Sequence, residues 1–357
     1  MLLSYDVLDG LGYFLNLLLL AFGVVLLIFG SDFFVRGASS MAKKLKMSSL
    51  VIGLTIVSFG TSAPELAISL SSSLKGESGL ALGNVVGSNI MNTLCVVGFA
   101  AIFSPIVVKK SLCKREFPFL LASTVFLLIF SMDNLFSGYS GIENILSRGE
   151  CLIFVLGIGL FCYISIVMAK KDALLEIGHA DIDKNIQKEE KRLPWWLDVI
   201  FFLGGLAGII FGAEFVTTPA TKIATSLGIQ ANLDKELVTN VVGLTVIAIG
   251  TSLPELVTSI VASKKGENDI AIGNAVGSSI FNVLFICGLS GVITPLTMTS
   301  DIITDAIISL VFIITVFIMS LKGKITRSNG LTLILLYVLY VSYILIRLFY
   351  PFIVIPF

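Results

Sequence analysis

Long apolar segments separated by short polar ones dominate this chain. A helix needs about 20 apolar residues to cross the hydrocarbon of a bilayer, so segments of that length predict transmembrane helices. Ten such segments are present, at 11–38, 48–74, 79–104, 117–134, 150–169, 196–226, 237–263, 269–293, 301–321 and 330–349. We therefore expect an all-α polytopic membrane protein with ten transmembrane helices, surrounded by a lipid bilayer.

One stretch of the chain occurs twice. Residues 53–105 and 243–295 align without a gap, and about half of their positions are identical. The first copy begins in the second predicted helix and the second copy in the seventh, so equivalent residues enter the membrane from opposite sides. Such inverted repeats are typical of secondary transporters. We expect two inverted five-helix halves, 1–169 and 195–357, joined by a polar linker at 170–194.

Composition supports the membrane assignment. The chain has 357 residues, of which 56% are hydrophobic and only 13% charged, too apolar for a soluble globular protein. Its formal net charge is zero and it lacks a basic tract with interleaved aromatic residues, which argues against nucleic acid as a partner. The 5 cysteines show no paired spacing, so we interpret them as small apolar side chains.

The distribution of basic residues predicts the orientation. If ten helices alternate in direction, 19 of the 24 Lys and Arg residues fall on the side opposite the N-terminus. Cytoplasmic loops carry the excess of Lys and Arg, so that side is predicted to be the cytoplasm. We therefore expect a multi-pass protein of the cell membrane with both termini extracytoplasmic and the 170–194 linker cytoplasmic.

Each copy of the repeat carries the motif Gly-Thr-Ser-x-Pro-Glu in the middle of a predicted helix, ending at Glu65 and Glu255. Proline interrupts a helix, and an interruption at mid-membrane frees backbone carbonyls, here around residues 58–61 and 248–251. Carbonyl and carboxylate oxygens together form the hard site that calcium and sodium prefer. The pattern predicts a buried cation site.

A purely structural role is the alternative interpretation of these motifs. Ser62 and Ser252 precede Glu65 and Glu255 by three positions, the spacing of a helix capping box. Glutamine would cap about as well without a charge, yet both copies retain glutamate. Because a carboxylate at the bilayer centre is costly and usually marks an ion pathway, we favour ion binding.

A second motif follows on the third and eighth predicted helices. Its polar residues are spaced by four, which places them on one side of each helix. They are Asn84, Ser88 and Asn92 in the first copy, and Asn274, Ser278 and Asn282 in the second. Hydrogen bonding between helices is the alternative role of any one of them. Together with the two glutamates, the set predicts an oxygen-rich cation site built by four helices.

The two GTSxPE motifs, each followed by GNxxGSxxxN, resemble the alpha-repeats of the calcium/cation antiporter superfamily, most closely those of sodium/calcium exchangers. The resemblance implies that Glu65 and Glu255 bind calcium with the carbonyls of Thr61 and Thr251. It also implies sodium sites that share the glutamates. Their further ligands would be Ser62, Ser252, Ser88 and Ser278 and carbonyls near Ser58 and Ala248. Asn92 and Asn282, which are both neutral, belong to the predicted cation site through the spacing of the second motif.

One departure from the family pattern bears on the coupling ion. Many relatives, including the potassium-dependent ones, have Asp where this chain has Asn282, so we do not expect potassium co-transport. Members of the proton-coupled branch have GNxxE at the first motif, whereas this chain has GTSxPE there.

We therefore expect a sodium/calcium antiporter that uses the sodium gradient to export calcium by alternating access. A proton-coupled calcium/cation exchanger and a cation channel on the same core are the alternatives. We expect no enzyme, because His179 is the single histidine and no nucleophile–base pair lies at membrane depth. We also expect no cofactor, only transported Ca²⁺ and Na⁺ in the core.

Overall fold

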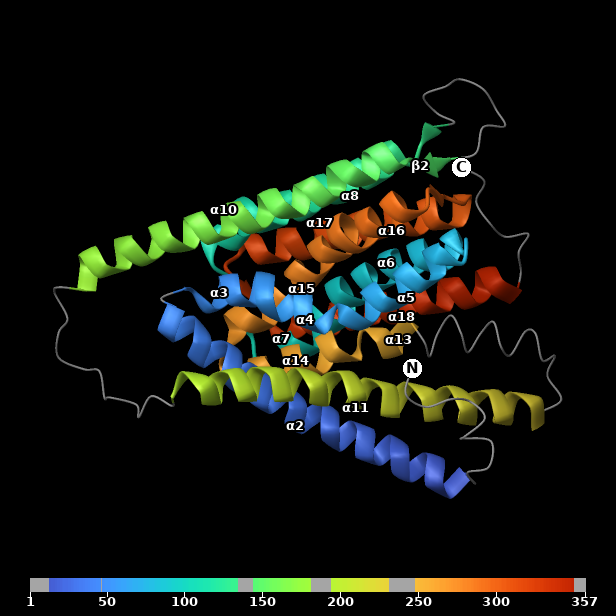
Figure 1. The fold of residues 1–357 in the computed structure, drawn as a ribbon, viewed down its shortest axis with the longest axis horizontal. Helices are drawn as coiled ribbons and strands as arrows, with labels where there is room; N and C mark the ends of the chain where they lie inside the picture. The colour runs from blue at the N-terminus through green and yellow to red at the C-terminus, as the bar shows by residue number, and fades with distance from the viewer. Residues whose placement is uncertain (1–12, 46, 134–143, 181–193, 231–247, 350–357) are drawn as a thin grey trace.

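The computed structural model describes residues 13–45, 47–133, 144–180, 194–230 and 248–349, and these are mostly helical (Figure 1). The elements of the first half are α2 (Tyr13–Leu45), α3 (Ser49–Ile52), η1 (Gly53–Val57), α4 (Ser58–Thr61), α5 (Ala63–Leu74), α6 (Ser78–Met91), η2 (Asn92–Val96), α7 (Val97–Phe103), β1 (Ile106–Val107), η3 (Leu112–Glu116), α8 (Phe117–Phe130), β2 (Ile145–Leu146) and α10 (Arg148–Ala180). Those of the second half are α11 (Trp195–Gln230), α13 (Ala248–Thr251), α14 (Leu253–Lys264), α15 (Asn268–Phe281), η5 (Asn282–Cys287), α16 (Gly288–Ile293), β3 (Leu296–Thr297), α17 (Ser300–Leu321), β4 (Lys324–Ile325) and α18 (Arg327–Phe349).

The prediction of ten spans is confirmed in part. Within the described residues, 7 helices are long and apolar enough to cross a bilayer. An eighth, broken span joins Ser49–Thr61 to Ala63–Leu74 with a bend of 48°. The fourth predicted span appears as α8, which has only 14 residues and follows the π-helical segment η3. The beginning of the seventh, residues 237–247, lies outside the described residues.

Helices α2 and α11 pack against each other along one edge of the bundle (Figure 1). Glycine makes the close approach possible: a Cβ atom added to Gly205 would lie 2.4 Å from the backbone nitrogen of Phe34 and 2.7 Å from the carbonyl oxygen of Gly30. Backbone contact at small residues is how membrane helices associate without a hydrophobic driving force. An ion pair between Lys44 and Asp198 adds to the contact. The two helices form one tight unit, here called the α2–α11 pair.

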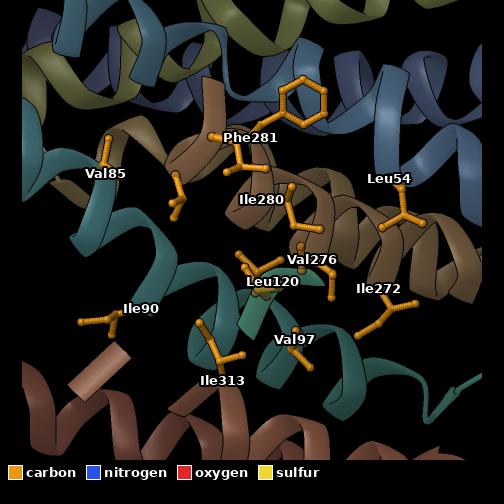
Figure 2. Close-up of a cluster of buried hydrophobic side chains, with 14 of the residues drawn as sticks. Leu54, Val85, Ile90, Val97, Leu120, Ile272, Val276, Ile280, Phe281 and Ile313 are labelled. Atoms are coloured by element: carbon orange, nitrogen blue, oxygen red, sulfur yellow. The ribbon is translucent and has the colours of Figure 1, made fainter. Parts of the chain in front are cut away.

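A buried apolar cluster joins helices of both halves. Figure 2 shows Val97 of α7, Leu120 of α8, Val276 of α15 and Ile313 of α17 in this cluster, and all four side chains are buried. Since α7 and α8 come from the first half and α15 and α17 from the second, the core intermixes the two halves. The apolar core is therefore shared between the two halves of the chain.

Two short antiparallel ribbons correct the expectation of a purely helical protein. Strand β1 pairs with β4 through Ile106 and Ile325, and β2 pairs with β3 through Ile145 and Thr297. Each strand has two residues, too short for an alternating pattern to be visible in the sequence. Strands β1 and β3 directly follow the first and second copies of the repeat.

Helix ends also differ from the predicted boundaries. Helix α10 continues to Ala180, so the beginning of the predicted 170–194 linker is helical. The predicted boundary followed the change from apolar to polar residues, but no proline stops the helix there, and polarity alone does not end a helix. The linker residues 181–193 and both chain termini lie outside the described residues.

Candidate cation-binding site

Both signature helices are interrupted at one serine. Ser62 separates α4 from α5 with φ and ψ of −82° and 10°, and Ser252 separates α13 from α14 with −92° and 7°. Pro64 and Pro254 lie in the first turn of the helix that follows. A backbone N–H at that position has no partner within the helix, so a proline there costs no hydrogen bond. The helices therefore break where the motif predicted.

The two interruptions exchange contacts. The Ser62 hydroxyl donates to Oε1 of Glu255 at 2.8 Å, and the Ser252 hydroxyl donates to Oε1 of Glu65 at 3.2 Å. Both carboxylates are fully buried. The two bonds are reciprocal, as expected when the copies are related by a two-fold axis. They bring both glutamates into one site.

The capping interpretation does not hold for the two serines. Neither Ser62 nor Ser252 accepts a hydrogen bond from the backbone of the helix that it precedes. Their hydroxyls instead contact the carboxylate of the other copy. The serines thus serve the site between the copies.

Each glutamate keeps one oxygen available. The Oε2 atoms of Glu65 and Glu255 are buried and have no hydrogen-bond partner among the described residues. A buried ionised oxygen without a partner is strongly unfavourable, so each of these atoms is a candidate ligand for a cation. Within the described chain no group of three or more His, Cys, Asp or Glu side chains could hold a metal. Among the described residues, the other polar side chains near this site are neutral hydroxyl and amide groups.

Hydroxyl groups from α6 and α15 complete the surroundings of the carboxylates. The Ser88 hydroxyl lies 3.1 Å from that of Ser252, and the Ser278 hydroxyl lies 3.4 Å from Oε1 of Glu255 and 3.5 Å from the carbonyl oxygen of Ser58. The structure thus brings these predicted residues together. It corrects one expectation: the Ser58 carbonyl is not free, because it accepts the amide of Ser62 at 3.0 Å.

Both predicted threonines are buried where the helices break. The Thr61 hydroxyl donates to Oδ1 of Asn274 at 3.0 Å, which ties α4 to α15. Thr251 is the last residue of α13, whose described part includes Ala248. The backbone of both residues therefore lies beside the interruption that the resemblance assigns to carbonyl ligands.

Two asparagines hold the backbone of the glutamates. The Asn84 amide donates to the carbonyl oxygen of Glu65 at 3.1 Å and to the Ser69 hydroxyl at 2.9 Å. In the second copy Asn274 makes the equivalent bonds at 3.3 and 3.1 Å, the latter to Ser259. Sequence reasoning missed the two serines. Their identity at equivalent positions, one helical turn after each glutamate, was the available signal.

Asn92 and Asn282 differ from the other polar residues. Asn282 donates to Oδ1 of Asn89 on α6 at 3.0 Å and makes no hydrogen bond to a carboxylate of the described residues. Asn89 was not among the predicted residues. Asn92 is fully buried, and neither atom of its amide has a hydrogen-bond partner. Both residues begin π-helical segments, η2 and η5, which are frequent at functional sites. The change of helical period there is invisible to an argument from spacing by four.

Comparisons with known proteins agree with this geometry. Residues 15–167 and 197–346 match the family pattern of the sodium/calcium exchanger protein. The chain is 34% identical over 358 residues to the sodium/calcium exchanger MaX1 of Methanosarcina acetivorans, covering 94% of this chain and 99% of MaX1. It is 36% identical over 301 residues to the inner membrane protein YrbG of Escherichia coli, covering 82% and 86%.

A solved structure has the same fold. The sodium-calcium exchanger NCX_Mj, soaked with zero Na⁺ and Ca²⁺, superposes with a TM-score of 0.76 at 26% identity, covering 93% of this chain and 100% of that one. The family match spans both halves, and MaX1 is matched over nearly its full length. The chain therefore belongs to the sodium/calcium exchanger family, a family of transporters and not of enzymes.

Proposed function

We propose that this protein is a sodium/calcium antiporter, in which the sodium gradient drives calcium export by alternating access. The observation that carries the proposal is the reciprocal pair of contacts, Ser62 to Glu255 and Ser252 to Glu65, between the two copies of the repeat. Both carboxylates are fully buried, and each has one oxygen without a partner. Relatives named sodium/calcium exchangers support the same cargo.

The chemistry of the site accounts for exchange. Two ionised glutamates carry a charge that matches one Ca²⁺, with the carbonyls of Thr61 and Thr251 as additional hard ligands. Sodium would use the serine hydroxyls around the same glutamates. Because the ions share the carboxylates, calcium cannot stay bound while sodium occupies them. Mutual exclusion at one buried site couples the movement of one ion to that of the other.

The proposal includes the number and orientation of the transmembrane helices. We infer ten transmembrane helices in two inverted halves, with the alpha-repeats at 53–105 and 243–295. The excess of Lys and Arg on one side supports a cell-membrane protein with extracytoplasmic termini and a cytoplasmic 170–194 linker. Inverted halves place the shared site near the middle of the membrane, where it can open to either side.

Calcium flux into proteoliposomes tests the function. Vesicles loaded with sodium and diluted into choline should take up ⁴⁵Ca²⁺, and equal sodium on both sides should abolish that uptake. Vesicles with Glu255→Gln protein are the matched control, and a calcium ionophore verifies that the accumulated calcium is free.

Three outcomes contradict the proposal. Uptake driven by a pH gradient without sodium would indicate a proton-coupled exchanger. Currents far above the turnover of a carrier would indicate a channel. Wild-type uptake no faster than that of the Glu255→Gln control would refute the assignment of calcium transport.

A further inference from the structure

The α2–α11 pair contacts the rest of the protein at the turn between α14 and α15. The Lys265 ammonium lies 2.5 Å from Oδ1 of Asp32 on α2 and 2.8 Å from its carbonyl oxygen. Two turns farther along α2, the Ser39 hydroxyl donates to Oε1 of Glu267 at 2.5 Å. Gly266, between the two turn residues, has a φ of 79°, a left-handed conformation that favours glycine. An acid and a hydroxyl on one helix thus meet a lysine and a glutamate on one turn.

The other half of the chain carries the same four chemical groups at equivalent positions. Overlaying the repeats relates this turn to the α5–α6 turn, where Gly76 has a φ of 76°. Overlaying Gly-Ser-Asp-Phe on Gly-Ala-Glu-Phe relates α2 to α11. The equivalent residues are Glu214 and Thr221 on α11, and Lys75 and Glu77 in the α5–α6 turn.

At that other end the equivalent contacts are not made. The Lys75 side chain is exposed and forms no ion pair in the part of the chain that the structure describes. The Glu77 side chain is exposed as well. The Thr221 hydroxyl donates within its own helix, to the carbonyl oxygen of Thr217 at 2.8 Å. The α2–α11 pair is therefore docked through these groups at the Lys265 end and not at the Lys75 end.

We propose that Asp32–Lys265 and Ser39–Glu267 are one position of a two-position latch, whose second position is Glu214–Lys75 and Thr221–Glu77. The proposal rests on the proposed function, because inverted halves that exchange conformations are the basis of alternating access. When the halves exchange, the first set of contacts opens and the second set closes. The latch holds the α2–α11 pair against one turn at a time.

Matched contacts at the two ends keep the two states close in free energy. A latch at one end alone would bias the ratio of the two states toward the state in which it is closed. The Asp32 and Lys265 side chains are each 25% exposed, so water partly screens their attraction. Loss of a pair of this kind should change the ratio of the two states by about two- to fivefold.

Cross-linking across the second latch position tests this without relying on transport. The parent protein carries Lys75→Cys and Glu214→Cys in a background whose native cysteines are replaced by alanine or serine. Those native residues are Cys95, Cys113, Cys151, Cys162 and Cys287. A short bifunctional methanethiosulfonate should link the introduced pair slowly in the parent. Adding Lys265→Gln should raise the linking rate about two- to fivefold, because the first latch position is lost.

Two control variants make the result specific. Lys265→Arg preserves the charge and should give the parent rate. Lys264→Gln removes the neighbouring lysine, whose ammonium lies 4.2 Å from the centre of the Phe103 ring, and should also give the parent rate. Equal rates for Lys265→Gln and Lys264→Gln, or the absence of any link in folded protein, would overturn the latch. A lower melting temperature for Lys265→Gln with an unchanged linking rate would assign the ion pair a purely structural role and also overturn it.

Calcium flux measured on the same variants, before the cysteine pair is added, separates this inference from the proposed function. If linking changes as expected but no variant carries calcium, the latch stands and the antiport assignment fails. If sodium-driven calcium flux is normal and the linking rates do not respond to Lys265→Gln, the antiport assignment stands and the latch fails.

Discussion

Oγ of Ser62 lies 2.8 Å from Oε1 of Glu255, a hydrogen bond between residues 193 positions apart in the chain. Its counterpart joins Ser252 to Glu65. The interrupted helix of each copy therefore donates a hydrogen bond to the carboxylate of the other copy. The contacts of the candidate site therefore join the two copies of the motif.

Neutralising either glutamate should stop calcium exchange. Glu65→Gln and Glu255→Gln preserve the size of the side chain and its contact with serine, but each removes one of the two charges that balance Ca²⁺. We expect sodium-driven ⁴⁵Ca²⁺ uptake to fall to the level of empty vesicles. The elution volume of the purified variants should match the wild type, because glutamine fills the same buried space. Near-normal uptake in either variant would refute the site assignment.

Adjacent glycines on α11 should respond oppositely to one added methyl group. A Cβ atom on Gly205 would lie 2.4 Å from the backbone of α2, whereas one on Gly204 meets nothing within 4 Å. Gly205→Ala should therefore lower the melting temperature, with an overpacking cost of about 1–3 kcal/mol. Gly204→Ala should leave it unchanged or raise it slightly, since alanine favours the helix. Thermal unfolding of purified protein measures both, and equal stability of the two variants would argue against the close α2–α11 contact.

The basic residues predict which side of the membrane each loop faces. A single cysteine at Gln187, in the 170–194 linker, should resist an impermeant maleimide in intact cells and react once the membrane is opened. Lys75→Cys, on the opposite side in the same cysteine-free background, should react in intact cells. The reverse pattern would invert the proposed topology, and labelling of both sites in intact cells would contradict a ten-helix count.

Most residues of the candidate site could be predicted because the motif occurs twice in the sequence. Glu65 and Glu255 stand out because each is an acid in an apolar run at equivalent positions, and the cost of burying a charge makes such residues informative. The serine that follows one turn later in each copy, Ser69 and Ser259, was missed because serine is unremarkable in a membrane helix. Identity between copies, and not residue type, would have identified it.

The remaining features depend on geometry that a linear pattern does not contain. Asn282 contacts Asn89 of α6, and a π-helical segment begins at Asn282. π-Helical segments have no distinct signature in residue type or spacing. The two-residue strands of the ribbons are too short for periodicity. The docking of Lys265 on Asp32 joins residues far apart in the chain, and only the packed helices show that one end is engaged while its equivalent is not.

Asn282→Asp should alter ion coupling more than it alters calcium binding. The residue is fully buried, donates to Asn89 and leaves its own Oδ1 without a partner. An aspartate there adds a third negative charge to a region that already holds Glu65 and Glu255. A buried charge must be neutralised, so the variant should recruit a proton or an additional monovalent cation in each cycle. We expect calcium flux in the variant to depend on pH or on potassium where the wild type does not.

The measurement is ⁴⁵Ca²⁺ flux for both proteins, with potassium present or replaced by choline, across a pH series. Asn282→Ala, which removes the hydrogen bond to Asn89 without adding a charge, distinguishes the effect of charge from that of a lost contact. A wild type that already requires potassium, or a variant that follows the wild type under every condition, would show that this position does not select the coupling ion.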